Sequence, residues 1–224
     1  MKNIKFRKIY YIIITIFILL FFVRNCDLRN RGYVNIKFVE NPSDILVLVN
    51  KQNRLMSSYI PDDLVTLDIK YSNANKELRK EAAIAFELLS ADALLLGYRI
   101  VAVSAFRDYD YQKKLYNYYV RERGYTYADS CSARAGHSEH QTGLAVDVEG
   151  SNHDYNNFKD TNEFDWMKNN AHRYGFILRY PKGKERITGF KYEPWHYRFV
   201  GVEVATYIFE NNLTLEEYLE KNKD

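Results

Sequence analysis

The chain has 224 residues, of which 46% are hydrophobic and 27% charged, a composition and length that fit one well-packed domain with a short extension. Its formal charge of +3 arises at the N-terminus, because residues 1–31 hold seven Lys or Arg and one Asp, and the rest of the chain holds 25 basic and 28 acidic residues. This mildly acidic remainder argues against a nucleic-acid partner. The two cysteines, Cys26 and Cys131, define no disulfide framework, and we expect two unpaired thiols rather than a bridge.

The N-terminus has a basic tip, residues 1–8, followed by an almost unbroken apolar run over residues 9–23. A helix of this run spans about 22 Å, less than the ~30 Å hydrocarbon core, but Phe6 and snorkelling lysines extend it. No small-x-small cleavage site follows, so we expect residues 1–24 to be a cytoplasmic tip and an uncleaved membrane anchor. Basic residues flank the run on both sides and leave its orientation open. Residues 25–44 are polar and mixed, which predicts a stem before a domain at residues 45–224.

The first half of the domain alternates predicted strands with two helices. Residues 45–49 suit a buried strand, and residues 59–69 an extended passage. Between residues 75 and 96, apolar residues recur at steps of three and four, which predicts a long amphipathic helix capped by Gly97. A strand over residues 98–104 follows. Arg107 lies just past it, before a Tyr-rich helix that we expect Gly124 to close.

The segment from residue 136 to residue 150, GHSEHQTGLAVDVEG, carries the densest chemistry in the sequence. Residues 144–149 alternate as in a strand, with Asp147 on the face opposite the apolar side chains and small Ala145 as its neighbour on that face. His140 lies just before this strand, on a turn that Gly143 can bend. A second cluster places Glu193 three residues before His196.

The second half of the domain predicts further helices and a hairpin. Residues 161–174 form a helix capped by Gly175, after a polar loop at 152–159. Residues 176–180 and 187–192 read as strands joined by a hairpin at 181–185, and the second strand delivers Glu193 and His196. A helix follows at 202–209, and Thr214 begins a capping box. The fold class is α+β, a small mostly antiparallel sheet flanked by helices.

Together the two clusters supply two His, one Asp and a spare Glu. Three protein ligands and an open fourth position are typical of catalytic rather than structural zinc, and a nearby unligated Glu can act as its general base.

Three segments of the chain resemble the zinc D-alanyl-D-alanine carboxypeptidases of the VanY type, which trim peptidoglycan stem peptides. They are Ser138-x-His140-x-x-Gly143-x-Ala145-x-Asp147, Glu193-x-Trp195-His196, and Ser104-Ala105-Phe106-Arg107 with Gln112. The resemblance covers roughly residues 45–203. It implies one zinc ion in a cleft on the sheet, bound by His140, Asp147 and His196. It also implies Glu193 as general base and Arg107 as the oxyanion or substrate contact, with Ser138 and Gln112 helping to hold the peptide.

The resemblance implies a D,D-carboxypeptidase that releases the C-terminal D-alanine from stem peptides ending in D-Ala-D-Ala. A cell-wall substrate places the domain outside the cell, so we expect a single-pass membrane protein with an extracytoplasmic catalytic domain. An L,D-carboxypeptidase acting on tetrapeptide stems and a dipeptidase for free D-Ala-D-Ala are alternatives. A non-catalytic zinc-bearing peptidoglycan-binding module is another, although such a module has no need of Glu193.

Other polar residues compete for these roles. His137 has a chelating spacing to His140, but the family pattern and the extended strand both leave it out, so we expect it at the rim or hydrogen-bonded in the loop. His153 and His172 are expected to be structural or solvated. We expect the carboxylates of Glu139 and Glu149 to face solvent or to contact the metal ligands. The remaining candidates for substrate charge are expected to be surface or structural cations, namely Arg134, Arg179 and Arg198.

Overall fold

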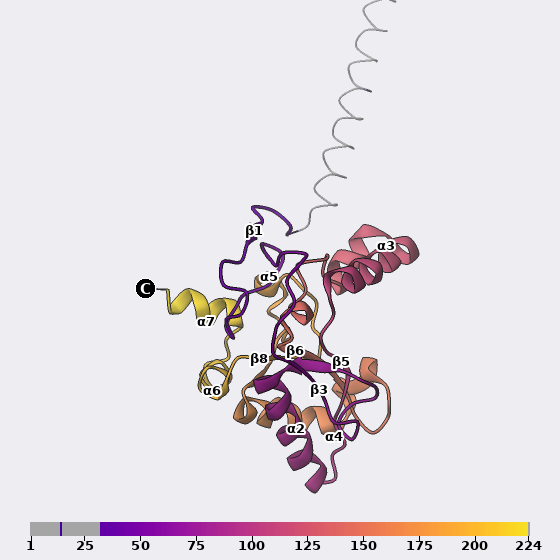
Figure 1. The fold of residues 1–224 in the computed structure, drawn as a ribbon, viewed down its shortest axis with the longest axis vertical. Coiled ribbons are helices and arrows are strands. Elements are labelled where there is room, and N and C mark those ends of the chain that lie inside the picture. The colour runs from indigo at the N-terminus through magenta and orange to yellow at the C-terminus, as the bar shows by residue number, and fades with distance from the viewer. Residues whose placement is uncertain (1–13, 15–31, 224) are drawn as a thin grey trace, which may run out of the picture.

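A four-stranded antiparallel sheet lies at the centre of the computed structural model, which describes Ile14 and residues 32–223. The strand order is β5-β6-β8-β7. The strands are β5 Val101–Ser104, β6 Ala145–Glu149, β8 His196–Phe199 and β7 Phe176–Leu178. The predicted class, a small mostly antiparallel sheet with helices packed on it, is confirmed (Figure 1).

Two helices cover one face of this sheet, α2 Lys80–Leu95 and α4 Asn162–Asn170 (Figure 1). Alternate residues of β6 and β8 pack toward them, because Val146, Val148, Tyr197 and Phe199 belong to the same buried cluster as Phe86 and Met167. The opposite face of the two strands is therefore left to the residues between these positions, which include Asp147 and His196.

Helix α2 begins later than the apolar spacing predicts. Residues Glu77–Arg79 form strand β4, which pairs with β3 Leu64–Thr66. The Arg79 side chain binds Asp63 at 2.9 Å and holds this junction outside the helix. At the other end the prediction is confirmed, since Leu96 is the C-cap and Gly97 follows with φ +85°.

The Tyr-rich helix α3, Tyr109–Cys131, begins at the N-cap Asp108, whose side chain accepts from Tyr111 N. Gly124 breaks its helical geometry with φ 79° and ψ 167°, but a second helical stretch continues to Cys131. Gly124 therefore divides the helix and does not close it, contrary to the prediction.

The predicted hairpin at residues 176–192 is wrong. Residues Glu185–Thr188 form the short helix α5, ended by Gly189 in a left-handed conformation. Strand β7 pairs instead with β8, where Leu178 lies opposite Tyr197. Glu193 consequently lies on the approach to β8 and not at the end of a preceding strand.

The predicted strand at residues 45–49 is also wrong. Val47 and Val49 are buried as expected. The backbone carbonyls of Ile45 and Val47, however, accept hydrogen bonds from the Arg198 side chain. The Arg198 guanidinium is thus hydrogen-bonded to backbone carbonyls that, in a sheet, would accept from the N–H groups of a neighbouring strand.

The remaining elements complete the frame. They are β1 Lys37–Phe38, β2 Asn53–Arg54, the 3-10 helices η1 Glu139–Thr142, η2 Tyr155–Asp160 and η3 Ala171–Tyr174, and the helices α6 Val202–Glu210 and α7 Leu215–Lys221. The predicted cap at Gly175 and the capping box of Thr214 are both confirmed.

Part of the expected stem packs against the domain, because Tyr33 is 4% exposed and its ring meets His137 edge-on at 4.9 Å. The membrane anchor expected at residues 1–24 lies, apart from Ile14, outside the described residues. Within Ile14 and residues 32–223, no helix has the length and apolarity to cross a membrane.

Candidate metal and catalytic site

Strands β6 and β8 place Asp147 directly opposite His196. Both residues lie on the sheet face that α2 and α4 do not cover, and Asp147 Oδ1 is 2.8 Å from His196 Nδ1. The alternation of residues 144–149 thus correctly predicts that Asp147 points away from the core.

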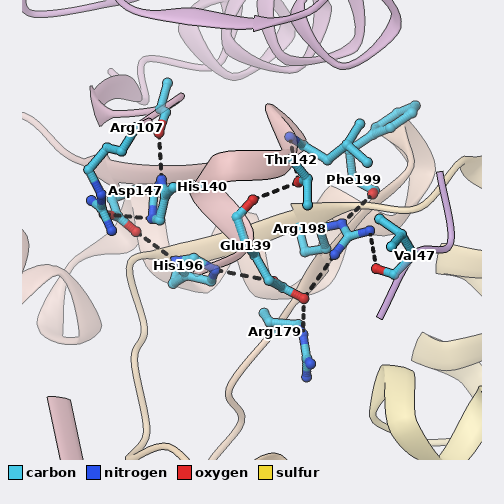
Figure 2. A network of polar contacts seen from close by, with 12 residues as sticks. Val47, Arg107, Glu139, His140, Thr142, Asp147, Arg179, His196, Arg198 and Phe199 are labelled. Atoms are coloured by element: carbon cyan, nitrogen blue, oxygen red, sulfur yellow. Dashed lines mark hydrogen bonds and ion pairs between the residues drawn. The ribbon is translucent and has the colours of Figure 1, made fainter. Parts of the chain in front are cut away.

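His140 reaches the same point from the 3-10 helix η1, where its Nε2 lies 3.3 Å from Asp147 Oδ2 (Figure 2). Gly143 ends η1 with φ 68°, a left-handed conformation that glycine adopts without strain. A Cβ at Gly143 would also lie 2.9 Å from Leu64 Cδ2 and 3.0 Å from Arg79 Cγ. The turn therefore requires glycine both for its backbone conformation and for space.

The donor atoms of His140, Asp147 and His196 all lie within 4.8 Å of one another. His140 Nδ1 lies 2.6 Å from the Ala105 carbonyl, which can only accept, so the ring proton belongs on Nδ1 and Nε2 presents a lone pair to Asp147. Burial lowers the pKa of His140 to about 4, which agrees with a neutral ring. Two acceptors thus face each other at 3.3 Å, an arrangement that a shared cation stabilises.

His196 has a matching arrangement on its outer side. Its Nε2 lies 3.5 Å from the buried Glu139 carboxylate, while Nδ1 faces Asp147. Burial lowers the pKa of His196, but the hydrogen bonds to Asp147 and Glu139 outweigh it and raise the pKa to about 9. Outer-side acceptors of this kind are typical of metal-binding histidines, so the three donors fit a zinc ion.

Glu193 and His196 belong to one tight turn. His196 N donates to Glu193 O at 3.2 Å, and Glu193 N donates to Tyr180 O at 3.1 Å. Pro194 occupies the second position of this turn, where its fixed φ is favourable. Burial raises the pKa of the Glu193 carboxyl to about 7, so this group can take up and release a proton near neutral pH.

Arg107 lies on the other side of Asp147. Its Nε donates to Gln112 Oε1 at 3.0 Å, and its Nη1 donates to Ser104 Oγ at 2.6 Å and approaches Asp147 Oδ2 at 3.5 Å. Gln112 is 1% exposed and also donates to Ala133 O. Gln112 therefore orients Arg107 from behind.

One cavity of about 790 Å³ joins these groups. Its walls include the three candidate ligands together with Glu193, Arg107 and Ser138. Gln112 is not part of the lining, whereas Tyr180, whose ring stacks on His196 at 4.9 Å between centroids, is.

Of the two alternatives expected for Glu139, solvent exposure is wrong and contact with a metal-ligand candidate is confirmed, because the carboxylate is buried 3.5 Å from His196 Nε2. The sequence did not predict the arginines that surround it. Glu139 Oε1 accepts from Arg179 Nε at 2.7 Å and from Arg198 Nη1 at 2.9 Å, with all three side chains 0% exposed (Figure 2). These two arginines hold the pKa of Glu139 below its usual value against the effect of burial. One signal was available in the sequence. Arg198 is two residues after His196, so in a strand both side chains lie on the same face.

The other candidates of the sequence are not among the three clustered donors, although Glu149 lines the same cavity. His137 is buried with Nδ1 2.8 Å from Asn50 O. Arg134 pairs with Asp129 at 2.8 Å, and His153 with Glu149 at 3.1 Å. His172 stacks on Phe209, and Cys131 has a free thiol.

Comparisons with known proteins show the family to which the chain belongs. The family model described as VanY, D-alanyl-D-alanine carboxypeptidase, matches residues 75–202. The chain is 45% identical over 192 residues to the putative carboxypeptidase YodJ of Bacillus subtilis. The matched region covers 83% of this chain and 70% of YodJ. The chain is 37% identical over 193 residues to a D-alanyl-D-alanine carboxypeptidase of Enterococcus faecalis, which covers 80% of this chain and 66% of that enzyme.

Solved structures share the fold, and two of them illustrate the similarity. The LdcB LD-carboxypeptidase has 44% identity and a TM-score of 0.79, with 85% of this chain and 92% of that chain covered. A mutant of the vancomycin resistance D,D-pentapeptidase VanY in complex with Zn(II) has 33% identity and a TM-score of 0.68, with 78% and 98% covered. The chain is therefore a member of the VanY family of carboxypeptidases and a peptide hydrolase.

Proposed function

We propose that this protein is a zinc-dependent D,D-carboxypeptidase that releases the C-terminal D-alanine from peptidoglycan stem peptides ending in D-Ala-D-Ala. One observation carries the proposal. A carboxyl group that is not among the clustered donors, Glu193, and a guanidinium, Arg107, line the same cavity as His140, Asp147 and His196. The family model and the Enterococcus faecalis relative support the choice of substrate.

The zinc ion would be held by His140 Nε2, the Asp147 carboxylate and His196 Nδ1. The other ring nitrogen of each histidine faces an acceptor, Ala105 O for His140 and the Glu139 carboxylate for His196, which leaves the ligating nitrogen free for the ion. When bound there, zinc would polarise the scissile carbonyl and make water a stronger acid.

The residues of this chain perform the remaining steps. Glu193 takes a proton from the attacking water and returns it to the amine of the leaving D-alanine, since its carboxyl group lines the cavity beside the donors without being one of them. Arg107 binds the oxyanion or the terminal carboxylate of the substrate, since a planar guanidinium can make paired hydrogen bonds. Gln112 and Ser104 keep Arg107 in place, and Ser138 contributes to holding the peptide from the cavity wall.

A second candidate is the L,D-carboxypeptidase reaction on tetrapeptide stems. It is favoured by the higher similarity to LdcB, which is described as an LD-carboxypeptidase, than to the VanY D,D-pentapeptidase. Both reactions release D-alanine and use the same groups. They differ only in the residue that precedes the bond.

We further propose that the domain acts outside the cell, held to the membrane by residues 1–24. The substrate class supports this placement, because peptidoglycan lies on the outer side of the cytoplasmic membrane.

Purified full-length protein with zinc tests the activity on defined tri-, tetra- and pentapeptide stems, with the products weighed by mass spectrometry. Loss of one alanine from the pentapeptide supports the first proposal, and loss from the tetrapeptide alone supports the L,D reaction. Glu193→Gln is the matched control, and we expect its turnover to fall by about 10²–10⁴-fold while zinc stays bound. Wild-type protein that binds zinc and stem peptide yet releases no D-alanine would leave only the binding module.

A further inference from the structure

The charges behind His196 continue from Glu139 into the C-terminal helix. Arg179 Nε donates to Glu139, while its Nη1 and Nη2 donate to the two carboxylate oxygens of Glu216 at 2.8 and 2.7 Å. Glu216 belongs to α7, Leu215–Lys221, outside the residues 75–202 that the family model matches. A continuous chain of charged contacts therefore connects α7 to the outer nitrogen of His196.

The positive and negative charges in this network of side chains are equal in number. Arg179 and Arg198 are 0% exposed, and they are matched by the carboxylates of Glu139, also 0% exposed, and Glu216, 14% exposed. Removing one member of a buried ion-pair network leaves an uncompensated charge. If Glu216 is neutralised, Glu139 becomes the only anionic partner of Arg179 in this network. The stronger attraction between Arg179 and Glu139 would then weaken the interaction of Glu139 with His196.

The geometry is as restrictive as the charge. Arg179 uses its Nε in one direction and both terminal nitrogens in the other, so its guanidinium cannot shift without breaking a hydrogen bond at one end. Helix α7 is itself held in place by the capping box of Thr214 and by the fully buried Leu215. Helix α7 thus fixes the position of Arg179, which together with Arg198 holds the Glu139 carboxylate.

We propose that Glu216, Arg179 and Glu139 form a positioning relay through which the C-terminal helix orients the His196 imidazole and strengthens it as a metal ligand. The inference rests on the proposed function only in that His196 binds zinc. A carboxylate on the outer nitrogen of a ligating histidine fixes its tautomer and raises its basicity, and mutation of such a partner costs about 10–100-fold in metal affinity.

The test compares zinc affinity in full-length variants, by competition with a chromophoric chelator. We expect Glu139→Gln to weaken zinc binding by about 10–100-fold and Glu216→Gln by about tenfold. Because both act through one path, the double variant should bind zinc no more weakly than Glu139→Gln alone. The matched control is Glu217→Gln on the same helix. Glu217 pairs with Lys184, and Gln preserves the capping box, so zinc affinity should not change.

The cobalt(II) absorption spectrum supplies a second readout, which should shift in the Glu139 and Glu216 variants but not in Glu217→Gln. If Glu139→Gln does not fold, Glu216→Gln and its conservative partner Glu216→Asp, which should retain more affinity, decide the question. Two results would overturn the relay: Glu216→Gln that loses thermal stability but binds zinc like wild type, or a double variant whose losses multiply. Wild-type protein that binds no zinc would instead contradict the proposed function itself.

Discussion

The backbone N–H of His196 donates to the carbonyl of Glu193 at 3.2 Å, so a metal-ligand candidate and the candidate general base belong to the same turn. Pro194 and Trp195 are the two residues between them. Because one turn carries both residues, a movement of the turn displaces Glu193 and His196 together. Glu193 therefore stays in the cavity that His196 lines, although it is not one of the three metal-ligand candidates.

The donor set predicts zinc stoichiometry. We expect the wild-type protein to bind close to one zinc ion, and His140→Ala, Asp147→Ala and His196→Ala each to lose it, because two remaining donors bind zinc weakly. His137→Ala is the matched control, since His137 is also buried and three residues from His140 but contacts Asn50. Metal analysis after dialysis checks this. Full occupancy in one of the three variants would remove that residue from the ligand set.

Glu193 predicts a pH-dependent stability. Its folded-state pKa of about 7 lies above the ordinary value of 4.5, so between these pH values the folded protein binds more protons than the unfolded one, and stability falls as the pH rises. In metal-free protein, Glu193→Gln should therefore be more stable than wild type above pH 7, by on the order of 3 kcal/mol, and the difference should vanish below about pH 4.5. Thermal or urea unfolding across this range measures it. An equal difference at pH 4 and pH 8 would contradict the cause.

Arg107 predicts a selective loss of substrate recognition. Arg107→Lys retains the charge but not the planar fork, so kcat/KM should fall by about tenfold or more. Substrates whose terminal carboxylate is amidated should lose less than normal ones if the fork binds that carboxylate. Steady-state kinetics on both substrates distinguishes the roles, because equal losses would assign Arg107 to the oxyanion instead.

The N-terminal sequence predicts a membrane-bound protein. Cell fractionation should recover the full-length chain with the membrane, and protease added to intact cells should reach residues 45–224. A soluble mature form that begins near Arg24 would show that residues 1–24 are a cleaved signal peptide.

The sequence predicted those features that depend on local pattern. The two-residue period placed Asp147 on the open face of β6, and the spacing of three and four residues predicted the C-terminal end of α2 at Gly97. The period of three and four found α2, although pairing of Glu77–Arg79 as β4 delayed its start.

The misses depend on contacts between distant residues. The partners of Glu139 are 40 and 59 residues away, so neither its burial nor its charge balance follows from local pattern. Residues 45–49 have the apolar composition of a strand. Two of their carbonyls, however, accept hydrogen bonds from Arg198, which is more than 150 residues away in the sequence. The hairpin expected at 181–185 failed because Glu185–Thr188 coil locally and leave β8 to pair with β7.

The pairing of β6 with β8 makes the candidate donor set dependent on the completed sheet. Asp147 and His196 are 49 residues apart and meet only when these strands pair. An unfolded or partly folded chain offers His140 and Asp147 but not the third donor in place. If the three donors bind zinc as proposed, tight binding requires the paired strands, and the zinc content of a preparation then reports the fraction of molecules that have completed the sheet.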